Sequence, residues 1–200
     1  MEKNILLAAI KTHVEILFAA HAKPYLLYHN FDHTQQVVEH ADAIAAHYSL
    51  NEDLRFILLA AAWFHDTGHL LSDIEKHEEK GVWIMRAFLS NRLLDERLRL
   101  EIGRCIMATK MPVQPVTLIE QILCDADTYH LGTPDFRTKD AAVWTEKELR
   151  LGRKFDNKAQ QSLAFLQAHT FYTDYCRQLL ADGKAANIAQ LEADIPKEDE

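Results

Sequence analysis

The segment LRFILLAAAWFHD, residues 54–66, constrains the fold more than any other stretch of this sequence. From its first residue to Phe64 the only polar side chain is Arg55, and a helix that is apolar on all sides is predicted to be buried. The run then ends in two adjacent ionisable residues, His65 and Asp66. Such groups at the end of a buried helix are costly unless other groups pair with them. The segment therefore predicts a central helix with a polar site at its end.

The overall composition is that of a compact all-α protein. The chain has 200 residues, of which 48% are hydrophobic and 26% charged, and a chain of this length can bury a sizeable core. Six glycines and five prolines are too few for a turn-rich all-β sandwich, whereas apolar residues recur at helical spacing along most of the sequence. We therefore expect an all-α bundle of about eight or nine helices.

Apolar stripes and breaks place the expected helices within one domain, residues 1–195. The clearest break is MPVQP at residues 111–115, and Asp32 is the expected N-cap of the second helix. The spacing of apolar residues predicts helices over about 6–17, 37–48, 54–64, 74–89, 98–106, 118–126, 139–151, 157–181 and 184–193.

Charge and cysteine content exclude several classes of partner. Thirty acidic and 22 basic residues give a net charge of −8, which disfavours binding nucleic acid through an open basic surface. Three scattered cysteines without a CxxC spacing favour reduced thiols and a cytoplasmic location. No segment approaches the roughly 18 uncharged apolar residues needed to cross a membrane. We expect a small-molecule partner, and the apolar helical surface is compatible with a homodimer.

Eleven histidines are the unusual feature of the composition. Several fall in four polar clusters at helix ends or on apolar helix faces, at residues 28–33, 63–69, 77–79 and 124–127. Imidazoles with carboxylates suit Zn, Mn, Fe or Mg, and an adjacent His-Asp pair on a helix projects about 100° apart, so that both can reach one ion. From the residues alone, a metal site and a set of satisfied core histidines with helix-capping aspartates are equally good interpretations.

Three of these clusters carry a known signature. His33, the pair His65-Asp66 and Asp127 resemble, in order, spacing and helical setting, the H…HD…D signature of the HD-domain metal-dependent phosphohydrolases. The resemblance spans about residues 25–130 and implies an HD-domain helical bundle. It implies that the four residues bind a divalent metal ion (Mn, Zn, Fe, Co, Ni or Mg). Asp66 would then bridge to a second, more weakly held ion if one binds.

The same resemblance implies catalytic roles around the metal ligands, with Asp66 among the catalytic residues. YHNFDH at residues 28–33 resembles the YHNxxH motif of class I cyclic-nucleotide phosphodiesterases, whose first histidine protonates the leaving oxygen. His29 takes that place here, and a helix-capping or surface histidine is the alternative. His69 is expected to orient the attacking water or to bind a second metal. Glu78 resembles part of the HE pair that some family members place beside the metal.

Two further residues are expected to contact the substrate. Lys110 precedes the proline-containing break, where its ammonium can meet a phosphate, although a lysine at a helix C-terminus is equally favoured by the helix macrodipole. His77 is the second, and a solvated helix face is the alternative for His77 and Glu78. Asp125 is expected to support the site from behind or to lie at the surface. The remaining histidines are expected to be surface or packing residues: His13, His21, His40, His47, His130 and His169.

The function predicted from these residues is metal-dependent hydrolysis of a phosphate ester of a nucleotide or another small phosphorylated metabolite. An HD-type iron oxygenase and a non-catalytic nucleotide-binding sensor are the alternatives. The oxygenase is disfavoured because HD proteins with six ligands place two extra histidines between the HD pair and the last aspartate. Here residues 67–126 contain only His69 and His77, both early. The helices over 131–195 form a C-terminal extension beyond the resemblance.

Overall fold

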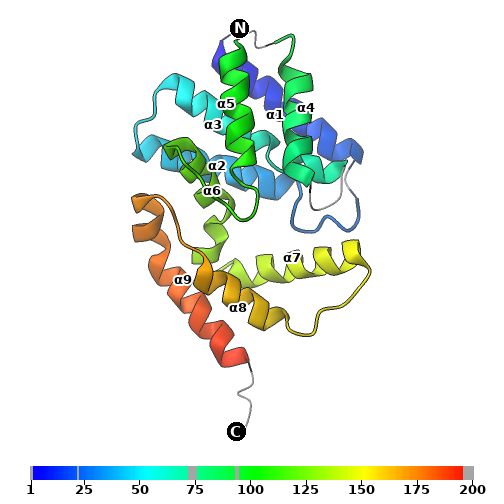
Figure 1. Cartoon of the computed structure of the whole chain (residues 1–200), viewed down its shortest axis with the longest axis vertical. Coiled ribbons are helices and arrows are strands. Elements are labelled where there is room, and N and C mark those ends of the chain that lie inside the picture. The colour runs from blue at the N-terminus through cyan, green and yellow to red at the C-terminus, as the bar shows by residue number, and fades with distance from the viewer. Residues whose placement is uncertain (1, 22, 72–75, 93–94, 196–200) are drawn as a thin grey trace.

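The computed structural model describes residues 2–21, 23–71, 76–92 and 95–195, which contain nine α-helices and no strand (Figure 1). The expected all-α bundle is therefore confirmed. The helices are α1 (Lys3–His21), α2 (Phe31–His47), α3 (Glu52–Phe64), α4 (His77–Leu89), α5 (Glu96–Met107), α6 (Leu118–Asp127), α7 (Phe136–Leu151), α8 (Lys158–Ala168) and α9 (Asp174–Asp194). Two short 3-10 helices, η1 (Thr67–Leu70) and η3 (Tyr129–Gly132), follow α3 and α6.

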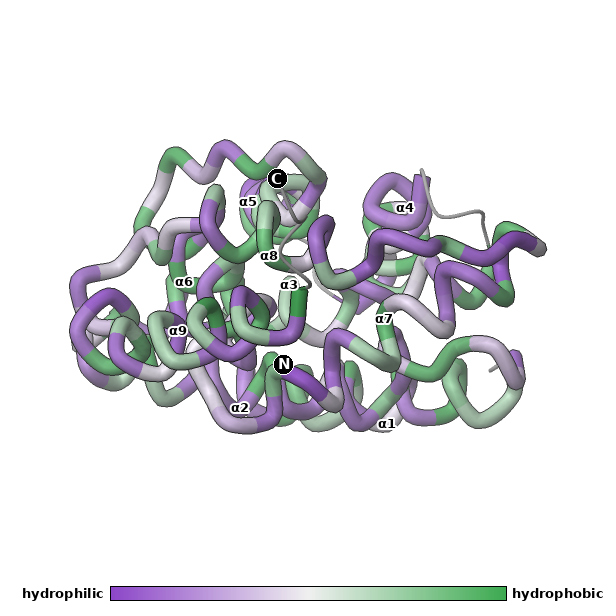
Figure 2. The backbone as a smooth tube through the Cα atoms, turned by 90° about the horizontal axis from the view of Figure 1, so that it is seen from below, coloured by the Kyte–Doolittle hydropathy of each residue, from purple (hydrophilic) through white to green (hydrophobic). Residues whose placement is uncertain are grey.

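Helix α3 is the centre of the fold, as its apolar sequence predicts. Every residue from Phe56 to Phe64 is buried, and α3 packs against α1, α2, α4, α5 and α6. Hydropathy alternates along most of the other helices (Figure 2), because these turn one face to the core and the other to water. None of the described helices is long and apolar enough to span a membrane.

The molecule has two parts, which meet mainly at η3, after α6. Helices α1, α2, α4, α5 and α6 surround α3, while α7, α8 and α9 lie below them in Figure 1. Helix α9 packs on η3 and on α8, so the C-terminal helices are held next to the end of α6. The metal-ligand candidates at the ends of α3 and α6 therefore face the C-terminal helices.

Two glycines let α4 pack closely against the HD segment. A Cβ atom on Gly68 would lie 1.8 Å from the carbonyl oxygen of His77, and a Cβ on Gly81 would lie 2.8 Å from the carbonyl oxygen of Phe64. Both distances are far below van der Waals contact, so only glycine permits this approach. The consequence is that the start of α4 is held directly beside His65 and Asp66. The expected start of this helix near Ile74 lies outside the described residues.

The N-terminal cap of α2 differs from the expectation. Asn30 is the N-cap, because its Oδ1 accepts a hydrogen bond from the backbone N–H of His33 at 2.9 Å. Asp32 lies exposed in the first turn instead, where its charge still favours the helix N-terminus. His33 therefore lies in the first turn of α2, while His29 precedes the helix.

The predicted break between the last two helices is also wrong. It falls at residues 169–173 and not near residue 182, because Asp125 binds the chain there: its carboxylate accepts hydrogen bonds from Tyr172 N at 2.7 Å and from Thr173 N at 2.8 Å. Asp125 is fully buried and so anchors the start of α9. Gly183 continues α9; a Cβ there would lie 2.0 Å from the carbonyl oxygen of Gly132, so this glycine allows a close helix contact.

The contact between α4 and α3 predicts opposite effects of two glycine substitutions. Alanine in place of a helical glycine normally stabilises by about 1 kcal/mol. We expect Gly81→Ala to lower the free energy of unfolding by about 1–3 kcal/mol, because α4 must move away from the end of α3. Gly103→Ala is the matched control, since its nearest atoms are side-chain carbons at 3.5 Å, and it should be neutral or stabilising. Urea unfolding measures both, and an unchanged Gly81→Ala would contradict the close contact.

Candidate metal centre

The four predicted metal ligands come together from three helices. His33 lies in the first turn of α2, His65 and Asp66 directly follow α3, and Asp127 ends α6. The Nε2 atom of His33 is 3.1 Å from Asp127 Oδ1 and 3.4 Å from Asp66 Oδ2. The Nε2 atom of His65 is 3.3 Å from Asp66 Oδ2 and 3.7 Å from Asp127 Oδ1. Two imidazoles and two carboxylates thus face one point.

His33 Nε2 and Asp127 Oδ1 are hydrogen-bonded to each other, whereas in the described part of the chain the other two candidate ligand atoms of this cluster are free for a metal. His65 Nδ1 lies 2.7 Å from the carbonyl oxygen of Ala62; since a carbonyl only accepts, Nδ1 carries the proton and Nε2 presents a lone pair. Among the described residues, His65 Nε2 and Asp66 Oδ2 are buried and have no hydrogen-bond partner. Buried polar atoms without a partner are costly. A divalent cation would satisfy both, and imidazole with carboxylate is a suitable donor set.

Electrostatics couple the four groups. Burial by itself lowers the pKa of His33 and of His65, but the carboxylates of Asp66 and Asp127 outweigh it, so that both pKa values are raised. Burial likewise would raise the pKa of Asp66 and of Asp127, and the two imidazoles outweigh it and lower both. Without a cation, the two rings therefore take up protons in its place.

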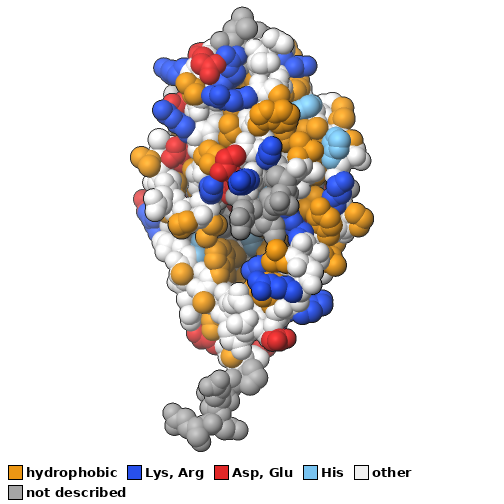
Figure 3. Space-filling view, turned by 45° about the vertical axis from the view of Figure 1, so that its right-hand side comes forward, with side chains coloured by type: hydrophobic (Ala, Val, Ile, Leu, Met, Phe, Trp, Pro, Cys, Tyr) orange, Lys and Arg blue, Asp and Glu red, His pale blue; other side chains and the backbone are white. Residues whose placement is uncertain are grey.

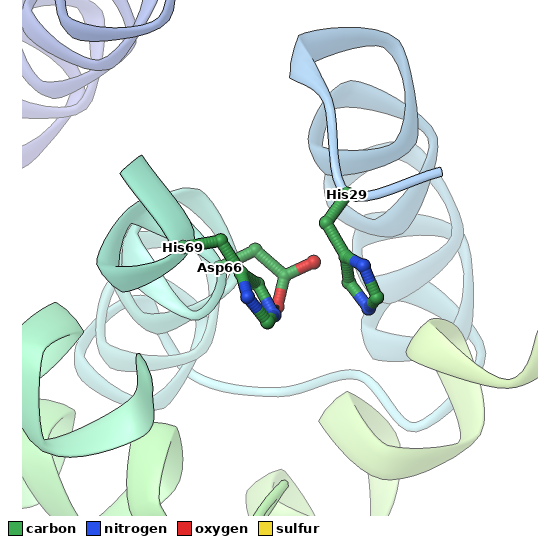
Figure 4. Close-up of side chains that lie close together, drawn as sticks. All are labelled: His29, Asp66 and His69. Atoms are coloured by element: carbon green, nitrogen blue, oxygen red, sulfur yellow. Dashed lines mark ion pairs between the residues drawn. The ribbon is translucent and has the colours of Figure 1, made fainter. Parts of the chain in front are cut away.

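A second group of imidazoles faces the other oxygen of Asp66. Side chains of His29, Asp66 and His69 point toward one another (Figure 4), and one potential ligand atom of each lies within 4.8 Å of the others. The Nε2 atoms of His69 and His77 are 3.8 and 3.9 Å from Asp66 Oδ1, and their rings stack at 3.8 Å between centroids. Asp66 therefore lies between two histidine clusters, one at each of its oxygens.

Two residues of α7 that the sequence analysis missed orient this second group. The carboxylate of Glu146 accepts a hydrogen bond from His29 Nδ1 at 2.7 Å and from the backbone N–H of His29 at 3.1 Å. Burial would raise the pKa of Glu146, but its hydrogen bonds from His29 and from the backbone lower it to about 2. Glu146 is therefore ionised, and it keeps a proton on His29 Nδ1, so the ring offers Nε2 to the site.

Arg150, one turn further along α7, determines the tautomer of His69. Its Nη1 atom lies 2.8 Å from His69 Nδ1 and 3.2 Å from Glu146 Oε1. A guanidinium group only donates, so His69 Nδ1 accepts and the ring proton is on Nε2. Burial, followed by the charge of His29, holds the pKa of His69 well below its usual value, which keeps the ring neutral. His69 is thus arranged to donate a hydrogen bond from Nε2, which favours the water-orienting prediction over the metal-ligand one.

The remaining predicted residues have different positions. Glu78 is buried; its Oε1 is 3.4 Å from His77 Nε2, and its Oε2 has no hydrogen-bond partner among the described residues. His77 and Glu78 both line the cavity at the metal centre. Lys110 instead forms an exposed ion pair with Glu79 and does not line the cavity. Its role as a phosphate ligand stays a prediction that this ion pair does not support.

Two histidines that were expected to be surface or packing residues line the cavity instead. His130 Nδ1 is 3.2 Å from the hydroxyl oxygen of Tyr28, and His169 Nε2 is 3.1 Å from Oγ1 of Thr128, the residue after Asp127. Burial lowers the pKa of His130 to about 3 and that of His169 to about 4, so both are uncharged near neutral pH. The sequence around them offers no signal for this position, because neither belongs to a recognisable motif.

A cavity of about 740 Å³ extends from the metal centre to α7 and α8. Its volume lies within the roughly 300–1,000 Å³ of small-molecule sites. Tyr28, His29, Asp66 and Asp127 form one end. One face of the molecule is hollowed, and hydrophobic as well as Lys and Arg side chains border the hollow (Figure 3). A ligand in the cavity would therefore reach the metal centre with one end.

The raised pKa values of His33 and His65 predict that metal affinity rises with pH. A bound ion must displace the ring protons, so Mn²⁺ or Zn²⁺ should bind more weakly at about pH 6 than at about pH 8. Titration calorimetry in two buffers of different ionisation enthalpy would detect the released protons.

Asp127→Asn should lower the affinity for the metal ion at least tenfold, since even the loss of outer hydrogen-bond partners of metal ligands costs about 10- to 100-fold. His40→Gln on α2 is the control for the Asp127→Asn variant. Equal affinities of the wild-type protein for the metal ion at both pH values would contradict the predicted pH dependence.

Comparison with known families agrees with this site. The family model described as HD domain matches residues 30–132, just over half of the chain. The match includes the four metal-ligand candidates but ends before Glu146 and Arg150. No curated protein and no solved structure matches the chain. HD domains are mostly metal-dependent hydrolases, and they bind divalent metal ions. The chain belongs to the HD-domain family.

Proposed function

We propose that this protein is a metal-dependent phosphohydrolase that cleaves a phosphate ester of a nucleotide or another small phosphorylated metabolite. The observation that carries the proposal is the position of Asp66. Its carboxylate lies between two histidine clusters at the end of a cavity large enough for a small molecule. His33, His65, Asp66 and Asp127 would hold the ion, which, when bound, polarises a phosphoryl oxygen and lowers the pKa of a water molecule.

His29 is proposed as the general acid for the leaving oxygen. With Nδ1–H bound to Glu146 at 2.7 Å, a protonated ring presents its second proton on Nε2, toward the cavity. A histidine is suited to protonate an alkoxide near neutral pH. Glu146 is a positioning residue in this mechanism: it holds the ring so that Nε2 faces the cavity.

His69 is proposed to hold the attacking water or a phosphate oxygen by its Nε2–H. Arg150 supports this role because it occupies Nδ1. A second ion, if bound, would then rest on Asp66 Oδ1 and His77 Nε2, which lie 3.9 Å apart. Two protein ligands hold an ion less firmly than four, so we propose that this second ion is weakly bound.

Phosphate release tests the activity itself. The purified protein, supplied with Mn²⁺ or Co²⁺, should release phosphate from at least one member of a panel of nucleotides and phosphorylated metabolites. Asp66→Asn, which keeps the shape of the side chain and removes its charge, should abolish turnover. Metal analysis of the same sample adds a second measurement, because bound iron with oxygen consumption would instead support the oxygenase alternative.

The general-acid role predicts a dependence on the leaving group. His29→Gln should lower kcat for alkyl phosphate esters by about 100- to 10,000-fold. It should change little for p-nitrophenyl phosphate, whose leaving oxygen needs no proton. Glu146→Gln should show the same selective loss to a smaller extent, with KM unchanged.

Glu148→Gln is the matched control for Glu146→Gln. Glu148 is also buried on α7, but its carboxylate binds Lys154, Lys158 and the backbone N–H of Phe155. The Glu148→Gln variant should retain activity with both alkyl and p-nitrophenyl esters. Equal losses for alkyl and p-nitrophenyl esters in His29→Gln would rule out the general-acid role.

A further inference from the structure

We infer that the substrate is a monophosphate ester of an uncharged alcohol that carries an aromatic ring system with a hydrogen-bond donor. This inference rests on the proposed function and narrows its substrate class. It derives from the part of the cavity that lies away from the metal centre, between α7 and α8.

The charges of the cavity wall leave room for only one phosphate group. Among the described lining residues, Lys147 is the one Lys or Arg, and its Nζ lies over the rings of Trp144 at 4.5 Å and Phe155 at 4.9 Å. His169 adds no positive charge, because burial lowers its pKa to about 4. A metal ion would neutralise one phosphate at the metal centre. A di- or triphosphate would place further negative charges inside the cavity, where Lys147 is the one Lys or Arg among the described lining residues, and uncompensated charge in a cavity is costly.

The walls of the far part of the cavity are mainly apolar and aromatic. Phe136, Val143, Trp144 and Phe165 line it, and apolar surface of this kind favours a ring over a polyhydroxylated sugar. Two of the polar groups there are paired with each other. Trp144 Nε1 donates to Ser162 Oγ at 2.7 Å, and that hydroxyl donates to an Asp140 carboxylate oxygen at 2.7 Å.

One buried polar atom of the lining residue His169 has no partner among the described residues, and its chemistry can be derived. Thr128 Oγ1 donates to the carbonyl oxygen of Cys124 at 2.8 Å, so toward His169 it can only accept. His169 Nε2, 3.1 Å from Thr128 Oγ1, therefore carries the ring proton, and Nδ1 presents a lone pair. This Nδ1 is buried without a hydrogen-bond partner among the described residues, and His169 lines the cavity. It is an acceptor that matches an N–H or O–H group on the ring portion of a ligand.

Four probes separate the features of this inference. AMP has one phosphate and a ring system with an N–H donor, 1-naphthyl phosphate has a ring without a donor, glucose 6-phosphate has no aromatic ring, and ATP has three phosphates. With the metal-loaded protein we expect kcat/KM to be at least about tenfold higher for the two aromatic monophosphates, AMP and 1-naphthyl phosphate, than for glucose 6-phosphate and ATP. Burying an aromatic ring contributes more than the 1.4 kcal/mol that a tenfold change requires.

Two variants test the individual contacts. Phe165→Ala should raise KM for AMP and 1-naphthyl phosphate about tenfold, but not KM for glucose 6-phosphate. Leu149→Ala, an exposed apolar residue on α7 that does not line the cavity, is its control. His169→Ala should lower kcat/KM for AMP relative to 1-naphthyl phosphate. This ratio is insensitive to a general loss of folded protein.

The outcomes distinguish this inference from the proposed function. If ATP and glucose 6-phosphate react as well as the ring monophosphates and Phe165→Ala changes nothing, the substrate class is wrong while the hydrolase stands. If wild-type protein turns over no ester with any metal, the proposed function fails. Calorimetry then tests separately whether the cavity binds AMP. Binding that is lost in Phe165→Ala and weakened in His169→Ala supports the inference, and the absence of binding to the wild-type protein overturns it.

Discussion

The buried carboxylate of Asp66 is the group around which this molecule is organised. A carboxylate at the end of an apolar helix is costly unless charges or hydrogen bonds compensate it. Here the imidazoles of His33 and His65 face one oxygen, and those of His69 and His77 face the other. These rings belong to α2, the end of α3, η1 and the start of α4. The ends of separate elements must therefore meet at one point, and Gly68 and Gly81 permit the close approach.

Two parts of the chain contribute different functions to the proposed site. The region matched by the HD-domain model, residues 30–132, supplies the metal-ligand candidates. The C-terminal helices supply Glu146 and Arg150, which determine where the ring protons of His29 and His69 lie, and they also supply the apolar walls of the cavity. The placement of these ring protons thus depends on the packing of α7 against the HD-motif end of the bundle, and substrate preference is expected to follow α7 and α8.

Local patterns predicted the helices well where each depends on its own apolar face. The central helix, the break at residues 111–115 and the all-α class follow from periodicity and from the scarcity of glycine and proline. The expected N-cap of α2 was wrong for a local reason, since Asn30 and not Asp32 accepts from the backbone N–H of His33. The wrong break between the last two helices has a distant cause. The chain breaks before α9 because Asp125 binds residues 172 and 173, and it continues through Gly183 because that glycine packs on Gly132. Neither contact can be predicted from a window of neighbouring residues.

The metal-ligand candidates His33, His65-Asp66 and Asp127 were predicted from their resemblance to the H…HD…D signature, which their order along the chain and their helical settings carry. The residues alone left a set of satisfied core histidines equally open. Only the tertiary structure decided the protonation of the rings around these candidates. The tautomer of an imidazole depends on the partner of its other nitrogen. For His29 and His69 that partner lies on α7, 117 and 81 residues away. The residues 146–150 read EKELR, like any solvated helix face, so their role became apparent only when the fold brought them to the site.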